Sequence, residues 1–509
     1  MEKYVKRILS AKVYDVAIET PIHEASNLSK RFHNQIGLKR EDLQPVHSFK
    51  LRGAYNKMAN LSADAAKRGV IAASAGNHAQ GIAMAGSKLG IKTVIVMPLT
   101  TPRIKSDAVK SLGGKVILHG DTYNEAASHA AKLVKEKGYT FVSAFDDPDV
   151  IAGQGTVGLE ILRQHSGHID AVFVPVGGGG LMAGIAAYIK FIRPDIKLIA
   201  VEAEDSACLK AALEAGRRVK LSQVGLFADG VAVAQIGKET FKVLRKTVDE
   251  VVTVTTDEIC AAVKDIFDDT RAVTEPAGAL AIAGIKKYIR DKNLSNKRLL
   301  GIVSGANVNF DRLRHISERT ELGEQREAVL AVGIDEKPGS FKRFSKALGK
   351  HNITEFNYRY GDSSSAKIFV GIEIDDTENS RTNLIDDLRK KGFSVLDMSS
   401  NEAAKLHIRH MVGGRIASIA NERVYRFEFP ERPGALMNFL EALGGRWNIS
   451  MFHYRNHGAA YGRVMVGIQV PKKEHKEFLA CLDRIAYPYW DETQNIAYQT
   501  FLAPSEASE

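Results

Sequence analysis

The chain has few cysteines and no long apolar run. Its three cysteines, Cys208, Cys260 and Cys481, are far apart in 509 residues and form no CxxC pair. Their number and spacing argue against a disulfide framework or a zinc cluster and favour a reducing, cytoplasmic setting. No apolar stretch is long enough to span a bilayer, and the first residues lack the apolar core and cleavage site of a signal peptide.

Basic stripes with interleaved aromatic residues are also missing. The net charge is +10, but the lysines and arginines are dispersed, as in Lys286, Lys287 and Arg290. This dispersion argues against nucleic-acid binding and indicates a mildly basic, solvated surface. With 44% hydrophobic and 26% charged residues the chain has a globular composition. Its length predicts about three units of ordinary size.

The amino-terminal part of the chain alternates between short apolar runs and longer helical patterns. Buried strands are predicted at residues 70–73, 93–97, 115–118, 171–176, 198–201 and 299–303. Helices are predicted at residues 77–89, 103–112, 123–135 and 181–191. Strands alternating with helices predict an α/β domain around a largely parallel sheet. In such sheets, ligands bind beyond the carboxyl ends of the strands.

Lys50 stands among apolar and small residues in the segment PVHSFKLRGAY, residues 45–55. Burial disfavours the charged form of a lysine, and a neutral lysine amine can attack an aldehyde to form a Schiff base. Taken alone, the segment also fits a surface lysine that opens a helix.

A small-residue segment stands where a predicted strand becomes a helix; it reads Ser74-Ala75-Gly76-Asn77-His78. Backbone N–H groups exposed at a helix N-terminus suit a carboxylate, and the Asn77 amide can hydrogen-bond a ligand hydroxyl. The alternative is a plain helix cap at Ser74 or Asn77. On either reading, the His78 side chain is expected to pack inside the helix.

Four consecutive glycines join another strand to a helix: Gly177, Gly178, Gly179 and Gly180. Successive N–H donors at the positive end of a helix dipole form a phosphate cradle. The segment lacks the lysine and hydroxyl of a Walker loop and does not fit GxGxxG, so ATP and NAD are poor matches. A tight turn is the alternative.

Ser304, in the segment GIVSGAN, presents a hydroxyl at the end of a third strand. Alone, it also fits a helix cap. Together with a Schiff-base lysine, a phosphate loop and the amide of Asn77, it fits pyridoxal 5'-phosphate. That cofactor needs a partner for its aldehyde, a phosphate site and a group at its ring nitrogen.

These motifs, in this order, resemble those of the fold-type II pyridoxal phosphate enzymes. The resemblance rests on SFKLRGA around Lys50, SAGNH, the glycine loop and SGAN, and also on EPAG, which begins at Glu275. It covers residues 1–320 and is greatest to the biosynthetic threonine deaminases.

The resemblance implies a role for each motif. Lys50 is expected to hold the cofactor as a Schiff base beside Phe49, and Asn77 to bond the ring hydroxyl. Ser304 is expected to face the pyridine nitrogen, and the phosphate to lie on Gly177, Gly178, Gly179 and Gly180. The substrate carboxylate is expected on Ser74, Ala75, Gly76, Asn77 and His78.

The expected chemistry follows from those groups. Lys50, once displaced from the cofactor, is the expected general base for the substrate Cα proton. Because Ser304 is a weaker partner than a carboxylate, we expect a neutral ring nitrogen, which favours prompt loss of the β-hydroxyl over a long-lived carbanion. The resemblance thus implies conversion of L-threonine to 2-oxobutanoate and ammonia, the first step of isoleucine biosynthesis.

One departure from related racemases concerns a cation site. Those relatives carry a glutamate after a strand and an aspartate six residues on, whereas here Glu202 is followed by Cys208. We therefore expect no metal at this position. Glu202 and Glu204 are expected at the surface or at an interface.

The carboxyl-terminal part contains an internal repeat after a charged linker at residues 321–326. EKPG at 336–339 recurs as ERPG at 431–434, and the pairs NI and YR and the triplet VGI recur after it in the same order. A shared order indicates two copies of one supersecondary unit. Each copy is predicted as strand, Pro-Gly turn, helix, strand and strand.

The two copies, residues 327–410 and 421–509, resemble the ACT-like regulatory domains of threonine deaminases. That resemblance implies isoleucine as an inhibitor, valine as its opponent, and a homotetramer. The effector-site candidates are Tyr358, Arg359, Tyr454 and Arg455. Their alternative is an ordinary position on a strand.

Two other functions remain open at this point. A serine racemase or a serine/threonine dehydratase shares the first part of the chain but usually lacks a doubled tail. A non-catalytic amino-acid sensor on a pyridoxal phosphate enzyme scaffold fits the tail, but the intact Lys50 and glycine loop argue against it.

Overall fold

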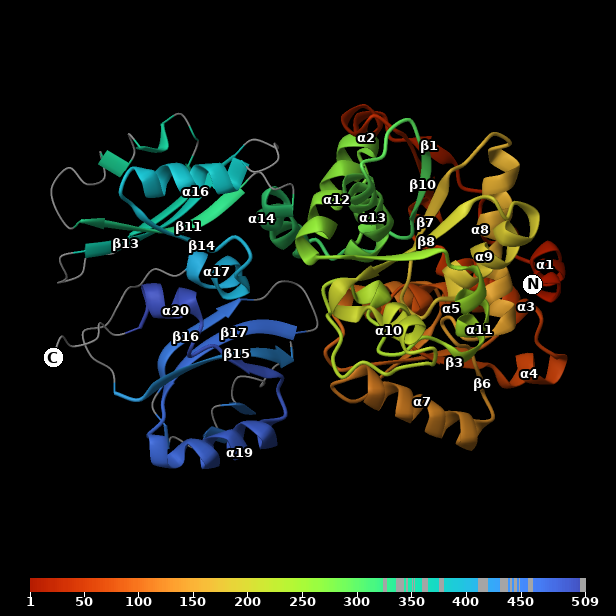
Figure 1. Cartoon of the computed structure of the whole chain (residues 1–509). Coiled ribbons are helices and arrows are strands. Elements are labelled where there is room, and N and C mark those ends of the chain that lie inside the picture. Colours follow the sequence, from red (N-terminus) through yellow and green to blue (C-terminus); the bar gives the residue numbers. More distant parts are fainter. Residues whose placement is uncertain are drawn as a thin grey trace. The chain divides into compact units, whose positions relative to one another are not determined.

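The computed structural model divides the chain into two compact units, Met1–Ser317 and Glu318–Glu509 (Figure 1). It describes residues 1–323, 327–335, 343–344, 347–349, 351, 353–358, 365–374, 380–410, 420–430, 438–439, 442–443, 446–447, 449–455 and 461–503. Within these ranges, no helix is both long and apolar enough to cross a membrane.

The larger sheet of the first unit has six strands in the order β1-β2-β10-β7-β8-β9. All neighbours are parallel except the antiparallel pair β1 and β2. The strands are β1 (Ile22–Glu24), β2 (Gln35–Arg40), β7 (Ala171–Pro175), β8 (Lys197–Ala203), β9 (Glu250–Val254) and β10 (Arg298–Val303). Strand β7 is buried along its whole length, which is typical of a parallel sheet covered on both faces.

Helices cover both faces of this sheet because successive strand residues point to opposite sides. Val172 and Val174 pack with the helices of one face, and Phe173 packs with those of the other. The first face is covered by α1 (Glu2–Leu9), α8 (Pro148–Gln164) and α9 (Gly180–Ile192). The second is covered by α2 (Ser26–Phe32), α12 (Thr256–Thr270) and α13 (Pro276–Lys292).

The smaller sheet of this unit has four parallel strands in the order β5-β4-β3-β6. They are β3 (Val70–Ala73), β4 (Thr93–Met97), β5 (Lys115–Leu118) and β6 (Thr140–Phe141). Val70 and Ala72 pack with α3 (Lys50–Ala59) and α5 (Asn77–Leu89), whereas Ile71 and Ala73 pack with α7 (Tyr123–Lys137).

The remaining elements of the first unit connect and flank the two sheets. They are η1 (Glu41–Leu43), α4 (Ala63–Arg68), α6 (Arg103–Ser111), η2 (Glu204–Ser206), α10 (Cys208–Glu214), η3 (Asp229–Val231) and α11 (Lys238–Thr247). Helix α14 (Arg312–Gly323) follows β10. The predicted α/β architecture with mostly parallel sheets is confirmed. Three predicted motifs follow the carboxyl ends of β3, β7 and β10.

The second unit contains two antiparallel sheets, ordered β12-β13-β11-β14 and β16-β17-β15-β18. The first comprises β11 (Glu327–Asp335), β12 (Ile353–Tyr358), β13 (Ser365–Glu373) and β14 (Ser394–Asp397), with α16 (Ser380–Lys390). The second comprises β15 (Glu422–Pro430), β16 (Ile449–Arg455), β17 (Tyr461–Gln469) and β18 (Tyr489–Asp491), with α19 (His475–Ile485). In chain order, α17 (Glu402–Leu406) and η4 (Ile408–His410) lie between the two copies, η5 (Lys472–Glu474) precedes α19 within the second copy, and α20 (Ile496–Phe501) follows β18.

The two sheets repeat one topology, down to a shift of register at the same point of each copy. In the first copy the shift lies between Ile353 and Glu355, and in the second between Ile449 and Met451. Each copy also has a further helix and a fourth strand, so the predicted order of strand, turn, helix, strand and strand was incomplete. The predicted Pro-Gly turns at 338–339 and 433–434 lie outside the described residues.

Candidate active site

Lys50 is the first residue of α3, and the backbone before it is tied to the end of β10. Ser48 forms a β-bridge with Gly305, and the Phe49 N–H donates to the Ser304 carbonyl over 3.4 Å. The lysine and the strand-end serine therefore belong to one site, although about 250 residues separate them in the sequence.

The Lys50 amine lies in a largely desolvated place. Its Nζ donates to the Gly230 carbonyl over 3.3 Å. Burial lowers the pKa of Lys50, and the opposing attraction of Glu275 and Asp229 does not cancel this effect. The sequence-based expectation of a lysine that loses its proton more easily agrees with this setting.

The Asn77 side chain is held at both ends of its amide. Its Nδ2 donates to Glu275 Oε1 over 2.6 Å, and its Oδ1 accepts from Asn307 Nδ2 over 2.7 Å. Asn307 is fixed in turn by the Val46 carbonyl at 2.8 Å. These contacts leave one Nδ2 hydrogen of Asn77 for a ligand. Sequence reasoning gave no role to Glu275 or Asn307, because only the fold brings them to Asn77.

The His78 side chain is buried in the interior of the protein. It is 2% exposed, and its Nε2 lies 2.9 Å from the Val142 carbonyl. Burial lowers its pKa to about 4, so the ring is neutral at pH 7. Its side chain is thus packed in the interior with a structural partner, as expected from the sequence.

The glycine loop leads from β7 into α9 and turns its carbonyls towards protein donors. The Gly177 carbonyl accepts from Cys208 Sγ at 3.3 Å, and the Gly178 carbonyl accepts from Thr240 Oγ1 at 2.8 Å. Within the described residues, the N–H groups of 177–180 donate to no protein acceptor. Free N–H groups before a helix form the arrangement expected for a phosphate.

Ser304 ends β10 and is 3% exposed. Its hydroxyl donates to the Ala277 carbonyl over 3.2 Å. That distance is long for an O–H···O hydrogen bond, so the hydroxyl can rotate towards another partner. The geometry is compatible with a contact to a ring nitrogen.

Asp229 is a site residue that sequence reasoning missed. Its carboxylate accepts from Lys105 Nζ at 2.7 Å and faces Arg312 Nη1 at 3.4 Å. Burial would raise the pKa of Asp229, but the charges of Lys105, Arg312 and Lys50 hold it well below its usual range. The next residue, Gly230, provides the carbonyl that contacts Lys50. In the sequence, this Asp-Gly pair is indistinguishable from an ordinary turn.

Glu202 was wrongly expected at the surface or at an interface. It is fully buried, and its two carboxylate oxygens accept from the N–H groups of Leu209 and Lys210 at 2.7 and 2.9 Å. Burial raises its pKa to about 7. Glu204, in contrast, is exposed. Among the described residues, no cluster of three or more metal-ligating side chains occurs.

The effector-site candidates can be placed only in part. Tyr358 ends β12 opposite Ile368, and Tyr454 and Arg455 lie near the end of β16. Only their backbone is described, and Arg359 lies outside the described residues. These residues therefore stay predictions.

Comparison with known proteins now assigns the two units to families. Residues 13–305 match the family of pyridoxal-phosphate-dependent enzymes. Residues 318–408 and 413–502 each match the C-terminal regulatory domain of threonine dehydratase.

Curated relatives match almost the whole chain. The biosynthetic L-threonine dehydratase of Burkholderia multivorans is 56% identical, with 98% of this chain and 99% of the relative covered. The Escherichia coli biosynthetic L-threonine dehydratase is 54% identical, with 98% and 97% covered.

The solved structures match about three fifths of the chain. The processed form of threonine deaminase isoform 2 from Solanum lycopersicum aligns with a TM-score of 0.62 at 50% identity, covering 62% of this chain and 92% of the other. Serine racemase from Dictyostelium discoideum aligns with a TM-score of 0.56 at 30% identity, covering 60% and 98%.

Proposed function

The chain belongs to the pyridoxal-phosphate-dependent enzymes and, among them, to the biosynthetic threonine dehydratases, and on this premise we propose a role for each residue of its site. It is a lyase that dehydrates and deaminates L-threonine. Water leaves in the elimination and is taken up again in hydrolysis, so the products are 2-oxobutanoate and ammonia. The predicted family, cofactor and reaction are confirmed.

The residues of the site fit pyridoxal phosphate. The free N–H groups of residues 177–180 suit its phosphate, and a Cβ on Gly178 would meet the Phe145 ring at 2.2 Å, so the cradle requires bare backbone. When bound, the cofactor supplies an electron sink that acidifies the Cα–H of the amino acid. We assign Lys50 as the residue that holds it, with Phe49 beside it.

The other residues orient the reacting groups. Asn77 would donate its remaining N–H to the ring hydroxyl of the bound cofactor, and Ser304 would face the ring nitrogen. The loop from Ser74 to His78 holds the substrate carboxylate through backbone N–H groups, with Ala75 and Gly76 leaving it open. The Lys50 amine takes the Cα proton, for which its lowered pKa is favourable.

One observation carries this proposal: the Phe49 N–H to Ser304 carbonyl hydrogen bond, which fixes Lys50 beside the end of β10. The test is an assay of 2-oxobutanoate formed from L-threonine by the wild-type chain and by Lys50→Ala. The wild type is expected to form product, and the variant to form none and to fix no cofactor after borohydride reduction. Turnover by Lys50→Ala would refute the assigned role.

The other functions considered are less well supported. The match to the Dictyostelium serine racemase takes in 98% of that protein but only 60% of this chain, so about two fifths of this chain has no counterpart in the racemase. A non-catalytic sensor would not need a desolvated lysine beside free backbone N–H groups. D-serine formation without 2-oxobutanoate would favour the racemase.

The tail provides feedback regulation in this proposal. Isoleucine binds the repeated sheets and lowers activity, and valine opposes it, with Tyr358, Arg359, Tyr454 and Arg455 as the effector-site candidates. A remote effector acts only by binding two states of the enzyme unequally. Product formation that is insensitive to isoleucine would overturn this part while leaving the catalytic assignment intact.

We further infer a cytoplasmic homotetramer. The domain boundaries we propose are residues 1–320 for catalysis, 321–326 for a linker, and 327–410 and 421–509 for the two regulatory subdomains. Sedimentation of the purified chain tests the tetramer.

A further inference from the structure

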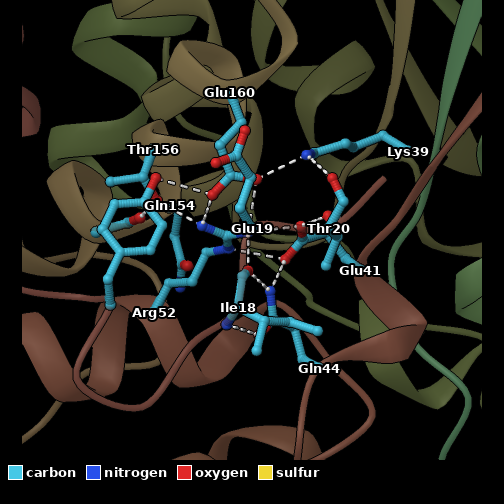
Figure 2. A network of polar contacts seen from close by, with 12 residues as sticks. Ile18, Glu19, Thr20, Lys39, Glu41, Gln44, Arg52, Gln154, Thr156 and Glu160 are labelled. Carbon is cyan, nitrogen blue, oxygen red and sulfur yellow. Dashed lines mark hydrogen bonds and ion pairs between the residues drawn. The ribbon is translucent and has the colours of Figure 1, made fainter. Parts of the chain in front are cut away.

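Arg52, two residues after Lys50, lies at the centre of a buried polar network in the first unit (Figure 2). Its Nε and Nη2 donate to the two oxygens of Glu41, each over 2.8 Å. Its Nη1 and Nη2 donate to the two oxygens of Glu160 over 2.5 and 3.0 Å. The guanidinium is thus held between two carboxylates in bidentate geometry on both sides.

The remaining donor capacity of Arg52 is also used. Nη1 donates to Thr156 Oγ1 over 3.0 Å, and Nη2 also reaches the Ile18 carbonyl at 3.2 Å. All five N–H groups therefore have acceptors. Such a complete set fixes the plane of the guanidinium as well as its position.

A second cation balances the charge of this network. Lys39 Nζ donates to Glu160 Oε2 over 2.6 Å and to the Thr20 carbonyl over 2.5 Å. The side chains of Lys39, Glu41, Arg52 and Glu160 are all 0% exposed. Two cations and two carboxylates give a formal charge of zero, as buried charges require. Burial would raise the pKa of Glu41, but Arg52 outweighs it and the pKa is lowered.

The partners come from different layers of the unit. Glu41 follows β2 of the larger sheet, and Glu160 belongs to α8. Arg52 belongs to α3, which covers the smaller sheet. A direct approach of α3 and α8 reinforces this contact, because a Cβ on Gly153 would meet the Arg52 carbonyl at 2.6 Å. The network therefore joins the first turn of α3 to the larger sheet and to α8.

We propose that Arg52 is a positioning residue for Lys50: its doubly bidentate contact fixes the rotation of the first turn of α3 and thereby aims the lysine amine at the Gly230 carbonyl. This inference rests on the proposed role of Lys50. The guanidinium donors of Arg52 are all taken by protein acceptors, so we assign it no contact with substrate or cofactor.

The variant Arg52→Lys separates a role in positioning Lys50 from a role in stability alone. Arg52→Lys keeps the charge but loses the planar fork, so it cannot bond both carboxylates in bidentate fashion. Arg163→Lys is the matched control, because Arg163 of α8 pairs with Glu19 at the surface and both side chains are partly exposed. If Arg52→Lys does not fold, Glu41→Gln replaces it, since it keeps the shape and weakens one of the two contacts.

The first measurement uses the full-length chain without cofactor. Trace labelling with acetic anhydride as a function of pH, read by mass spectrometry of the Lys50 peptide, gives the titration midpoint of that amine. We expect the midpoint to rise by about one pH unit in Arg52→Lys, because a displaced amine regains water. The dissociation constant for pyridoxal phosphate is expected to rise at least about tenfold. Arg163→Lys should match the wild type in both measurements.

A lower unfolding midpoint in Arg52→Lys, with an unchanged Lys50 titration and unchanged cofactor affinity, would overturn the proposal. The same holds for Glu41→Gln if it is the variant that folds. A different result would contradict the proposed role of Lys50 itself. In that case borohydride would still fix the cofactor in Lys50→Ala, on another lysine. This outcome does not depend on how Lys50 is labelled in the Arg52 variant, so the two failures can be told apart.

Discussion

Asn77 and Glu275, 198 residues apart in the sequence, are joined by a hydrogen bond of 2.6 Å from the amide nitrogen to the carboxylate. Glu275 is buried, and burial followed by repulsion from Asp229 raises its pKa. A second negative charge beside this buried carboxyl group would therefore be destabilising. The same hydrogen bond fixes the orientation of the Asn77 amide.

Asn77→Asp should consequently be more disruptive than Asn77→Ala. Aspartate replaces the amide donor by an oxygen that faces Glu275, so that two carboxylates share one buried place. We expect a loss of about 2 kcal/mol of unfolding free energy at pH 7 relative to Asn77→Ala, measured by urea denaturation. The difference should shrink as the pH falls, because one of the two coupled carboxyl groups then takes up a proton. Equal stability of the two variants at pH 7 would contradict this account.

Lys105 should matter for catalysis through Asp229. Lys105→Met removes the 2.7 Å contact to Asp229, whose neighbour Gly230 accepts from Lys50. Because both side chains are partly exposed, we expect only about 1 kcal/mol of lost stability. The displaced segment should lower kcat/KM for threonine about tenfold. Lys110→Met, on the exposed side of the same helix, is the control, and an equal effect there would refute the specific role.

His78 should make the protein less stable in acid. Its pKa is lowered to about 4 in the fold, against 6.5 for the free side chain, so the unfolded chain binds more protons between these values. Stability is therefore fully present above pH 6.5 and is lost as the pH falls towards 4. We expect about 2 kcal/mol of loss from pH 7 to pH 4.5. In His78→Gln, urea titrations at both pH values should show a loss of unfolding free energy that is smaller by this amount. If the variant loses as much stability as the wild type, other groups cause the loss.

The sequence predicted those parts of the molecule that depend on local signals. The alternation of apolar runs located β3, β4, β5, β7, β8 and β10 but not β1, β2, β6 or β9, and the glycine run located the loop before α9. Lys50, Asn77 and Ser304 could be singled out because each stands beside a strand end or a helix start. Such signals lie within a few neighbouring residues.

Other parts depend on contacts between distant segments and left no local signal. Asp229 resembles a turn residue until the fold brings Lys105 and Arg312 to it. Glu202 resembles a surface carboxylate, yet it accepts two backbone N–H groups at the start of α10. A buried charge is tolerated only with such partners, and pairing over long sequence separations cannot be derived from one segment.

Gly178→Ala should damage the cofactor site by a steric route. A Cβ at this position would meet the Phe145 ring at 2.2 Å, so the loop or the ring must move. We expect the dissociation constant for pyridoxal phosphate to rise about a hundredfold, since the displaced N–H groups no longer converge. Fluorescence titration with the cofactor measures this change. The double variant Gly178→Ala with Phe145→Ala should recover part of the affinity; no recovery would show that the ring is not the obstacle.

Unlike Gly178→Ala, Gly76→Ala should cause no steric clash within the protein, because the space beside Gly76 contains no protein atom within 4 Å. Its φ of −137° is accessible to alanine, so we expect the unfolding free energy to change by no more than about 0.5 kcal/mol. If the substrate carboxylate lies over this loop, the added methyl group occupies its place. KM for threonine should then rise about tenfold, whereas the affinity for the cofactor should hold. Steady-state kinetics and cofactor titration of the same preparation test both expectations. An unchanged KM in a stable variant would place the carboxylate elsewhere, and a matching loss of cofactor affinity would show that the loop belongs to the cofactor site.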